Sequence, residues 1–194
     1  MPTTSRRRSR RAGAVLLAPG AGADRDHHTL VALAEGLAPL PVTRMDFPYR
    51  KAGKRAPDRA PVAVAAVEEE AAATVAGAHV RADRLELGGR SYGGRMCSMA
   101  VAEGLPAAGL VLLSYPLHPP GKPDRARTGH LGDLEVPVLF VSGDKDPFGT
   151  PDELRAAAEA IPGPVTFEWL RGGHDPRNAD DAIVDAVRAW LTTL

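Results

Sequence analysis

Short apolar runs alternate with helix-like segments along nearly the whole chain, and this alternation limits the folds that the chain can adopt. The apolar runs lie at residues 13–18, 42–47, 84–87, 109–114, 136–142 and 165–169. Repeated strand–helix pairs of this kind predict a largely parallel sheet with helices on both faces. We therefore expect an α/β fold of about six mostly parallel strands. Right-handed crossovers then place the strand-to-helix loops along one edge of the sheet.

The length and composition indicate one globular domain. A chain of 194 residues can bury a sizeable core. Because only 5% of the residues are aromatic, that core must consist largely of Ala, Val and Leu. We expect residues 12–194 to form the single domain. Residues 1–11 carry five arginines and no acidic residue, which predicts a solvated, disordered tail rather than an anion-binding arm.

Charge and cysteine content bear on partners and location. The formal net charge is zero, so nucleic acid and anionic membranes are not expected as partners. No apolar run approaches the roughly 18 residues of a membrane span. The single cysteine, Cys97, fits a reducing compartment. The first residues resemble a twin-arginine export signal, but Pro19 and Gly20 interrupt its short apolar part, and we expect a cytoplasmic protein.

The sequence G-x-S-x-G occurs at residues 89–93, between a predicted strand and a predicted helix. This context is typical of a nucleophile elbow, in which a sharp turn exposes a serine hydroxyl above the sheet. The helix that follows has its N-terminus beneath Ser91, where developing negative charge is favoured. We predict Ser91 as a nucleophile. The alternative is a glycine-rich turn with an idle serine.

A serine nucleophile needs a neighbouring base, and the base needs an acid to orient it. His174 follows the last predicted strand, and both Asp144 and Asp146 follow the strand before it. The chain order serine, aspartate, histidine is the order found in α/β-hydrolases. We prefer Asp146 as the acid because it lies farther out in the turn and precedes Pro147, whereas Asp144 can stabilise the turn as an Asx residue.

Acyl transfer also requires hydrogen-bond donors for the oxyanion. The backbone N–H of Tyr92, directly after the nucleophile, is one expected donor. The N–H of Ala21 is the other, because Gly20 and Gly22 allow that amide to turn toward the site.

The sequence indicates a functional role less strongly for several other residues. Arg90 can contact an anionic substrate group or form a salt bridge, and His118 can reach the edge of the site from a proline-rich loop. His27 and His28 lie near two aspartates, but no matching distant ligand is evident, so capping and surface roles are favoured over a metal site. We expect no metal and no organic cofactor.

Six stretches of the sequence resemble a known family. They are L-A-P-G-A-G at 17–22, D-F-P-Y-R at 46–50, G-G-R-S-Y-G-G-R at 88–95, Y-P-L-H-P-P-G-K-P at 115–123, S-G-D-K-D-P-F-G at 142–149 and G-G-H-D at 172–175. The chain looks like a compact α/β-hydrolase. More narrowly, it is similar to the family of testis-expressed protein thirty and the third subunit of the NSL histone acetyltransferase complex, with their bacterial relatives. Dienelactone hydrolases share the general architecture but use cysteine where this chain has Ser91.

The resemblance implies a fold without a cap domain, with Ser91, Asp146 and His174 as a catalytic triad and Ala21 and Tyr92 at the oxyanion. It departs from many hydrolases at Pro19, where they have histidine. The function expected is hydrolysis of carboxylic esters or thioesters of small acyl groups, so the partner is a small-molecule acyl substrate. The alternative is a catalytically weak hydrolase scaffold that acts as a protein-interaction subunit. The sequence leaves the oligomeric state open.

Overall fold

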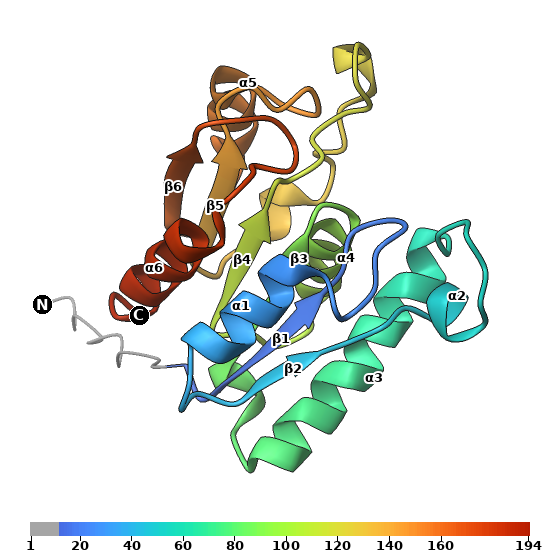
Figure 1. The fold of residues 1–194 in the computed structure, drawn as a ribbon, viewed down its shortest axis with the longest axis vertical. Helices are drawn as coiled ribbons and strands as arrows, with labels where there is room; N and C mark the ends of the chain where they lie inside the picture. The colour runs from blue at the N-terminus through green and yellow to red at the C-terminus, as the bar shows by residue number, and fades with distance from the viewer. Residues whose placement is uncertain (1–11) are drawn as a thin grey trace, which may run out of the picture.

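A single six-stranded sheet runs through the computed structural model, which describes residues 12–194 (Figure 1). The arginine-rich segment 1–11 lies outside the described residues, so its expected role as a tail stays a prediction. The strands are β1 (Ala14–Ala18), β2 (Val42–Arg44), β3 (Leu85–Arg90), β4 (Gly109–Leu113), β5 (Val138–Gly143) and β6 (Val165–Leu170). Their order in the sheet is β2-β1-β3-β4-β5-β6, and every neighbouring pair is parallel. The predicted α/β fold is confirmed.

Helices cover both faces of this sheet, as Figure 1 shows. One face is covered by α1 (His28–Gly36) and α6 (Asp180–Leu191), and the other by α3 (Ala60–Ala78), α4 (Tyr92–Ala102) and α5 (Pro151–Ala158). A short helix, α2 (Pro48–Lys51), and three single turns of 3₁₀ helix, η1 (Ala82–Arg84), η2 (Pro123–Arg125) and η3 (Leu131–Asp133), lie in the connections.

The two layers of core follow from the period-two alternation of buried strand residues. In β1, Leu16 faces α3 and α4, whereas Val15 and Leu17 face α1 and α6. The same alternation continues in the central strands, where Leu112 and Val111 point to opposite faces. Because helices cover both faces of the sheet, β1 consists of apolar residues without interruption, as is usual for parallel strands.

The connection from β2 to α3 differs from the prediction. The expected strand at 42–47 ends at Arg44, and the expected exposed loop from Tyr49 to Pro61 contains helix α2. Tyr49 is only 1% exposed and belongs to the core together with Phe47. Sequence patterning missed this because the two aromatic residues are surrounded by polar and basic ones, so neither a helical nor a strand period is visible.

Three element boundaries also differ from the prediction. Strand β3 continues from Leu87 to Arg90 because its last residues pair with β4 up to Leu113. Gly77 predicts the end of α3, but the helix passes through it to Ala78, and His79, with a left-handed φ of 54°, supplies the cap. The sequence predicts Asp24 or Asp26 as the N-cap of α1, but the observed N-cap is His27, whose side chain accepts the Thr29 N–H.

The long connection between β4 and β5 rises beyond the carboxyl edge of the sheet, with η2 near its tip (Figure 1). Within the described chain it contains only two single 3₁₀ turns, so no cap domain covers the strand ends there. No helix among residues 12–194 combines the length and apolarity needed to cross a bilayer.

A buried carboxyl group near the amino ends of the strands has no partner. Glu86 is fully buried, and both carboxyl oxygens lack a hydrogen bond. Its side chain occupies the space above Gly109, beside the ring of Trp190. Burial raises the pKa of Glu86 to about 8.

This raised pKa makes stability depend on pH. The folded chain holds the Glu86 proton to a higher pH than the unfolded chain does, so the unfolded state binds fewer protons between the ordinary carboxyl pKa and about 8. The free energy of unfolding therefore falls as pH rises through this window, by up to about 1.4 kcal/mol per pH unit from this one group. We expect Glu86→Gln to melt at a progressively higher temperature than wild type from pH 5 to pH 8. A constant difference in Tm across that range would contradict the assignment.

Candidate active site

Ser91 lies on a strained turn between β3 and α4. Its φ is 51° and its ψ is −117°, a conformation that residues with a side chain rarely adopt. The turn is held from the sheet side, because the Ser91 N–H donates to the Leu113 carbonyl at 2.8 Å. The hydroxyl is thereby presented at the carboxyl edge of the sheet, directly before the N-terminus of α4.

Two glycines make room for this turn. A Cβ on Gly89 would lie 2.2 Å from the Ala18 carbonyl oxygen, and a Cβ on Gly93 would lie 2.3 Å from the same atom. Both contacts are with backbone, which cannot swing away as a flexible side chain can. The G-x-S-x-G spacing is therefore required by the close approach of the turn to the end of β1.

A chain of hydrogen bonds joins three side chains that are distant in the sequence. His174 Nε2 lies 2.8 Å from Ser91 Oγ, and His174 Nδ1 lies 2.8 Å from Asp146 Oδ2. The Asp146 side chain is fully buried and also accepts the Phe148 N–H at 2.9 Å. The Phe148 ring lies against the imidazole, with 4.1 Å between the ring centroids. The imidazole is thus fixed on three sides.

Backbone contacts between the loops after β5 and β6 set the distance between aspartate and histidine. The Lys145 N–H donates to the Gly172 carbonyl at 2.8 Å, and the Gly172 N–H donates to Asp144 Oδ1 at 2.9 Å. Asp144 thus braces the loop, whereas Asp146 faces His174.

The loop after β1 lies beside the serine turn. Gly22 has a φ of 81°, and its N–H donates to the Tyr49 hydroxyl at 3.1 Å. The N–H of Tyr92 is the first of helix α4 and has no carbonyl partner within the helix. Ala21 and Tyr92 both line the cavity that contains Ser91. Tyr92 is fixed by its hydroxyl, which donates to the Asp58 carbonyl at 2.7 Å.

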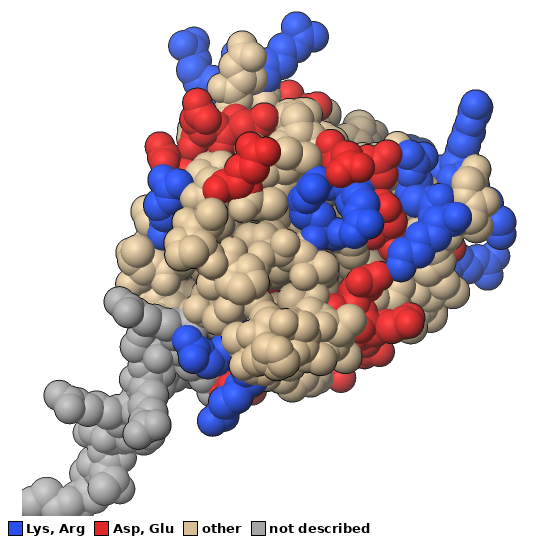
Figure 2. Space-filling view, turned by 60° about the horizontal axis from the view of Figure 1, so that its bottom comes forward, with Lys and Arg blue, Asp and Glu red and all other residues tan. Residues whose placement is uncertain are grey.

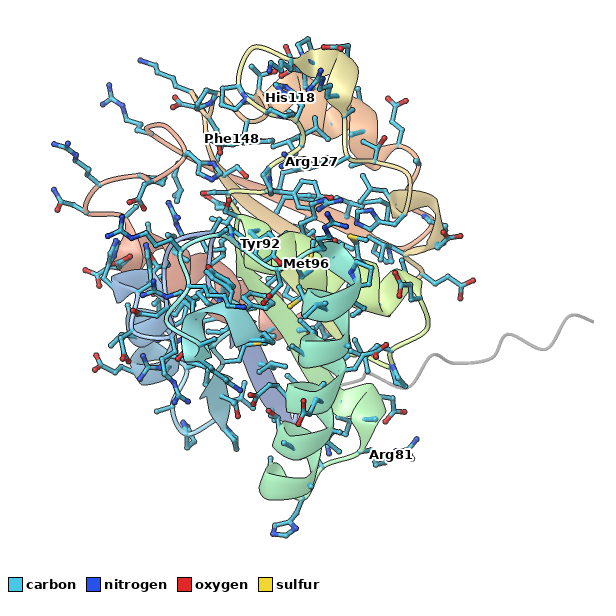
Figure 3. The ribbon with its side chains drawn as sticks, turned by 90° about the vertical axis from the view of Figure 1, so that its right-hand side faces the viewer. Arg81, Tyr92, Met96, His118, Arg127 and Phe148 are labelled. Atoms are coloured by element: carbon cyan, nitrogen blue, oxygen red, sulfur yellow. The ribbon has the colours of Figure 1, made fainter. Side chains whose placement is uncertain are left out.

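The cavity above Ser91 has a volume of about 390 Å³. It is lined by Ala21, Pro57, Arg90, Ser91, Tyr92, Arg95, Pro116, Arg127, Phe148 and His174. In Figure 3, Tyr92 lies on α4, and Arg127 and Phe148 lie beyond it in the loops above the strand ends. The lining contains three arginines and no carboxylate, although the chain as a whole has no net charge.

Arg90 and His118, the two residues predicted as possible substrate contacts, take different positions. The Arg90 guanidinium pairs with Asp175 at 2.8 Å and donates to the His174 carbonyl at 3.0 Å. It lines the cavity but also anchors the histidine loop. His118 is 5% exposed, lies 3.3 Å from Glu153 and is not part of the cavity lining. A hydrogen bond to the Pro119 carbonyl is the main cause that raises the His118 pKa.

The histidine pair at the start of α1 has a distant neighbour that the sequence did not reveal. His27, His28 and Asp175 each place one potential ligand atom within 4.8 Å of the others. Each of these groups already has a partner: His27 caps α1, His28 lies 2.6 Å from Asp180, and Asp175 pairs with Arg90. These contacts favour the capping and surface roles expected from the sequence.

Sequence reasoning missed Arg95 and Arg127 as lining residues. Arg95 lies in the first turn of α4, directly after the Ser91 turn, so its closeness in the sequence to Ser91 could have indicated it. Arg127 lies in a loop without periodicity, and no pattern in the sequence indicates where its side chain points. Cys97, by contrast, is fully buried away from the cavity, and its Sγ lies 3.3 Å from the Gly88 carbonyl oxygen.

The parallel sheet, the strained serine turn and the loops gathered at the carboxyl edge define the class of α/β-hydrolases. The chain belongs to the family described as alpha/beta hydrolase domain, whose model matches residues 11–185.

Solved structures of low sequence identity share the fold. A dienelactone hydrolase from Anabaena variabilis is 20% identical, with a TM-score of 0.75 over 94% of this chain and 86% of that one. The type II thioesterase BorB from the borrelidin biosynthetic cluster is 20% identical, with a TM-score of 0.68 over 95% and 96% of the two chains. Est1E from Butyrivibrio proteoclasticus, solved with ferulic acid, is 15% identical, with a TM-score of 0.73 over 95% and 90%.

Alanine substitutions at Gly93 and at Gly77 are predicted to have opposite effects on stability. Gly93→Ala places a methyl group into the Ala18 carbonyl, so we expect a lower melting temperature and a loss of Ser91 reactivity. Gly77→Ala places its methyl group in open space on helix α3 and should stabilise the protein by about 0.5–1 kcal/mol. Thermal denaturation of both variants checks the pair. A Gly93→Ala protein with wild-type Tm would show that the turn tolerates a side chain.

Proposed function

We propose that this protein is a serine hydrolase that cleaves carboxylic esters or thioesters of small acyl groups. The single observation that supports it most is the continuous hydrogen-bond chain from Ser91 Oγ through His174 to the buried Asp146 carboxylate. An ionised carboxylate only accepts hydrogen bonds, so His174 donates from Nδ1 and keeps a lone pair on Nε2. That lone pair accepts the Ser91 hydroxyl proton.

In the proposed reaction, Ser91 Oγ attacks the acyl carbonyl carbon while His174 Nε2 takes the hydroxyl proton. Asp146 stabilises the resulting imidazolium and keeps its orientation. The N–H groups of Ala21 and Tyr92 donate to the oxyanion of the tetrahedral intermediate, each being worth roughly 10²–10³ in rate. The protonated histidine then gives its proton to the leaving alcohol or thiol. Water then attacks the acyl carbonyl carbon while the same imidazole takes its proton, and that proton passes to Ser91 Oγ as the acid leaves the acyl-enzyme.

The size of the cavity and its position support small acyl groups. About 390 Å³ accommodates a compact substrate, and no cap domain extends the site within the described chain. We further propose that the protein belongs to the narrower group that contains testis-expressed protein thirty and the NSL complex third subunit, on the motifs given above. A cytoplasmic location is proposed from the single buried thiol of Cys97.

A fluorophosphonate probe tests whether Ser91 is an activated nucleophile. We expect covalent labelling of the wild-type protein, seen as a mass increase on the peptide that contains Ser91, and no labelling of Ser91→Ala. Ser98→Ala is a matched control, because Ser98 is a buried serine on the same helix whose hydroxyl donates to the Arg95 carbonyl. Absence of labelling in a folded wild-type protein would favour a protein-interaction scaffold with no turnover.

The two aspartates after β5 allow a second test of the hydrogen-bond chain. Asp146→Asn removes the negative charge and places a donor NH₂ group against His174 Nδ1, because the remaining oxygen accepts the Phe148 N–H. We expect kcat on p-nitrophenyl acetate to fall by about 10³–10⁴. Asp144→Asn keeps an oxygen that can accept the Gly172 N–H, so its kcat should fall by less than about ten-fold. Equal losses in the two variants would argue against Asp146 as the orienting acid.

A further inference from the structure

Two arginines in the wall of the active-site cavity lack a counter-charge. Arg95 comes from helix α4 and Arg127 from the loop between β4 and β5. Neither forms an ion pair with a carboxylate in the described part of the chain, whereas Arg90, in the same cavity, pairs with Asp175. The Arg95 Nε is buried without a hydrogen-bond acceptor. Arg127 reaches a protein acceptor only at 3.5 Å, the Pro116 carbonyl.

The two guanidinium groups influence each other electrostatically. The pKa of Arg127 is lowered first by burial and then by the positive charge of Arg95. Burial, together with Arg95, lowers the pKa of the adjacent His130 to about 4, so this imidazole is neutral at pH 7. The local positive charge therefore comes from arginine alone. Like charges that share a partly buried wall are costly without an anion between them.

The backbone holds Arg127 in place over the cavity. Its N–H donates to the Leu117 carbonyl at 2.8 Å, and its own carbonyl accepts the Tyr115 hydroxyl at 3.2 Å. Tyr115 is buried in the core, so this part of the loop is tied to the body of the protein. The backbone of Arg127 is thus fixed at the cavity, and its partly buried side chain forms part of the wall.

We propose that Arg95 and Arg127 bind a carboxylate or phosphate group of the substrate, so that the preferred acyl substrate of this hydrolase carries an anion close to the scissile carbonyl. The inference rests on the proposed function, and it names the class of substrate. Arg95 and Ser91 line the same cavity, and the Arg95 N–H donates to the Ser91 carbonyl at 3.1 Å, so the first turn of α4 carries Arg95 beside the space for an acyl group on Ser91. Guanidinium groups bind carboxylates and phosphates through paired, charge-assisted hydrogen bonds.

The face of the molecule shown in Figure 2 does not have the same bias, because basic and acidic side chains lie next to one another there and neither sign covers the face alone. The chain as a whole has no net charge, so the three arginines of the cavity wall are a local excess of positive charge. This argues for recognition of a small anion at the site over general attraction to polyanions.

Matched pairs of esters test the proposal. We expect wild-type kcat/KM to be about 10- to 100-fold higher for p-nitrophenyl hydrogen adipate than for p-nitrophenyl methyl adipate, which differs only by the masked carboxylate. The pair 4-acetoxybenzoate and methyl 4-acetoxybenzoate tests whether a carboxylate on the leaving group is preferred. Rates with Ser91→Ala give the uncatalysed background. Preference for the anion in either pair supports the proposal and identifies the side that carries it.

Arginine variants assign that preference to the two side chains. In Arg95→Gln and Arg127→Gln, the loss of kcat/KM should be at least about ten-fold larger for the preferred anionic ester than for its neutral partner. Arg127→Lys, which keeps the charge, should lose less than Arg127→Gln. Arg125→Gln is the matched control, because Arg125 is exposed on the same loop, and its ratio of anionic to neutral rates should equal that of wild type.

A binding measurement separates this proposal from the proposed function. Adipate and inorganic phosphate are titrated into Ser91→Ala, with and without Arg127→Gln, and Tm is followed. Stabilisation by either anion that disappears in the double variant supports the anion site even if the wild type hydrolyses nothing. A Ser91-dependent esterase with no preference for either anionic ester and no anion-dependent rise in Tm would overturn the inference and leave the proposed function intact.

Discussion

The backbone of the serine turn lies directly against the end of β1, and no side chain fits between them. Gly89 and Gly93 both approach the Ala18 carbonyl, and the residues that follow Ala18 form the loop that carries Ala21. One contact therefore sets the position of Ser91 relative to Ala21. Because Tyr92 begins α4 in the same turn, both candidate donors are fixed by the packing of β3 and α4 on β1.

The remaining parts of the site are attached to this contact by the parallel sheet. β5 and β6 are paired along their whole length, so the loops that carry Asp146 and His174 leave the sheet side by side. Hydrogen bonds between the loops then fix the distance between the two side chains. The geometry depends on backbone contacts more than on any single side-chain packing interaction, which explains why the core can consist largely of small aliphatic residues.

Much of this arrangement could be predicted from the sequence, because it depends on local patterns and on strand ends. The strand–helix alternation predicts the sheet, and the carboxyl ends of three strands bring Ser91, Asp146 and His174 to one edge. Tyr49 and Arg127 could not be found in this way. Tyr49 is buried by tertiary contacts within a basic segment, and Arg127 is placed over the cavity by a long loop whose path no periodicity encodes.

His118 was predicted to reach the edge of the site, but it does not line the cavity. The same loop that brings Arg127 to the cavity takes His118 to Glu153 on α5.

A shallow site without a cap offers few surfaces for binding, so the side chains that do line it must supply most of the selectivity. Apolar contacts discriminate weakly between small acyl groups, whereas a buried charge strongly disfavours substrates that leave it unpaired. Arginines without a carboxylate partner in the described chain, set beside the serine, are therefore the features of this wall with the greatest capacity to select a substrate.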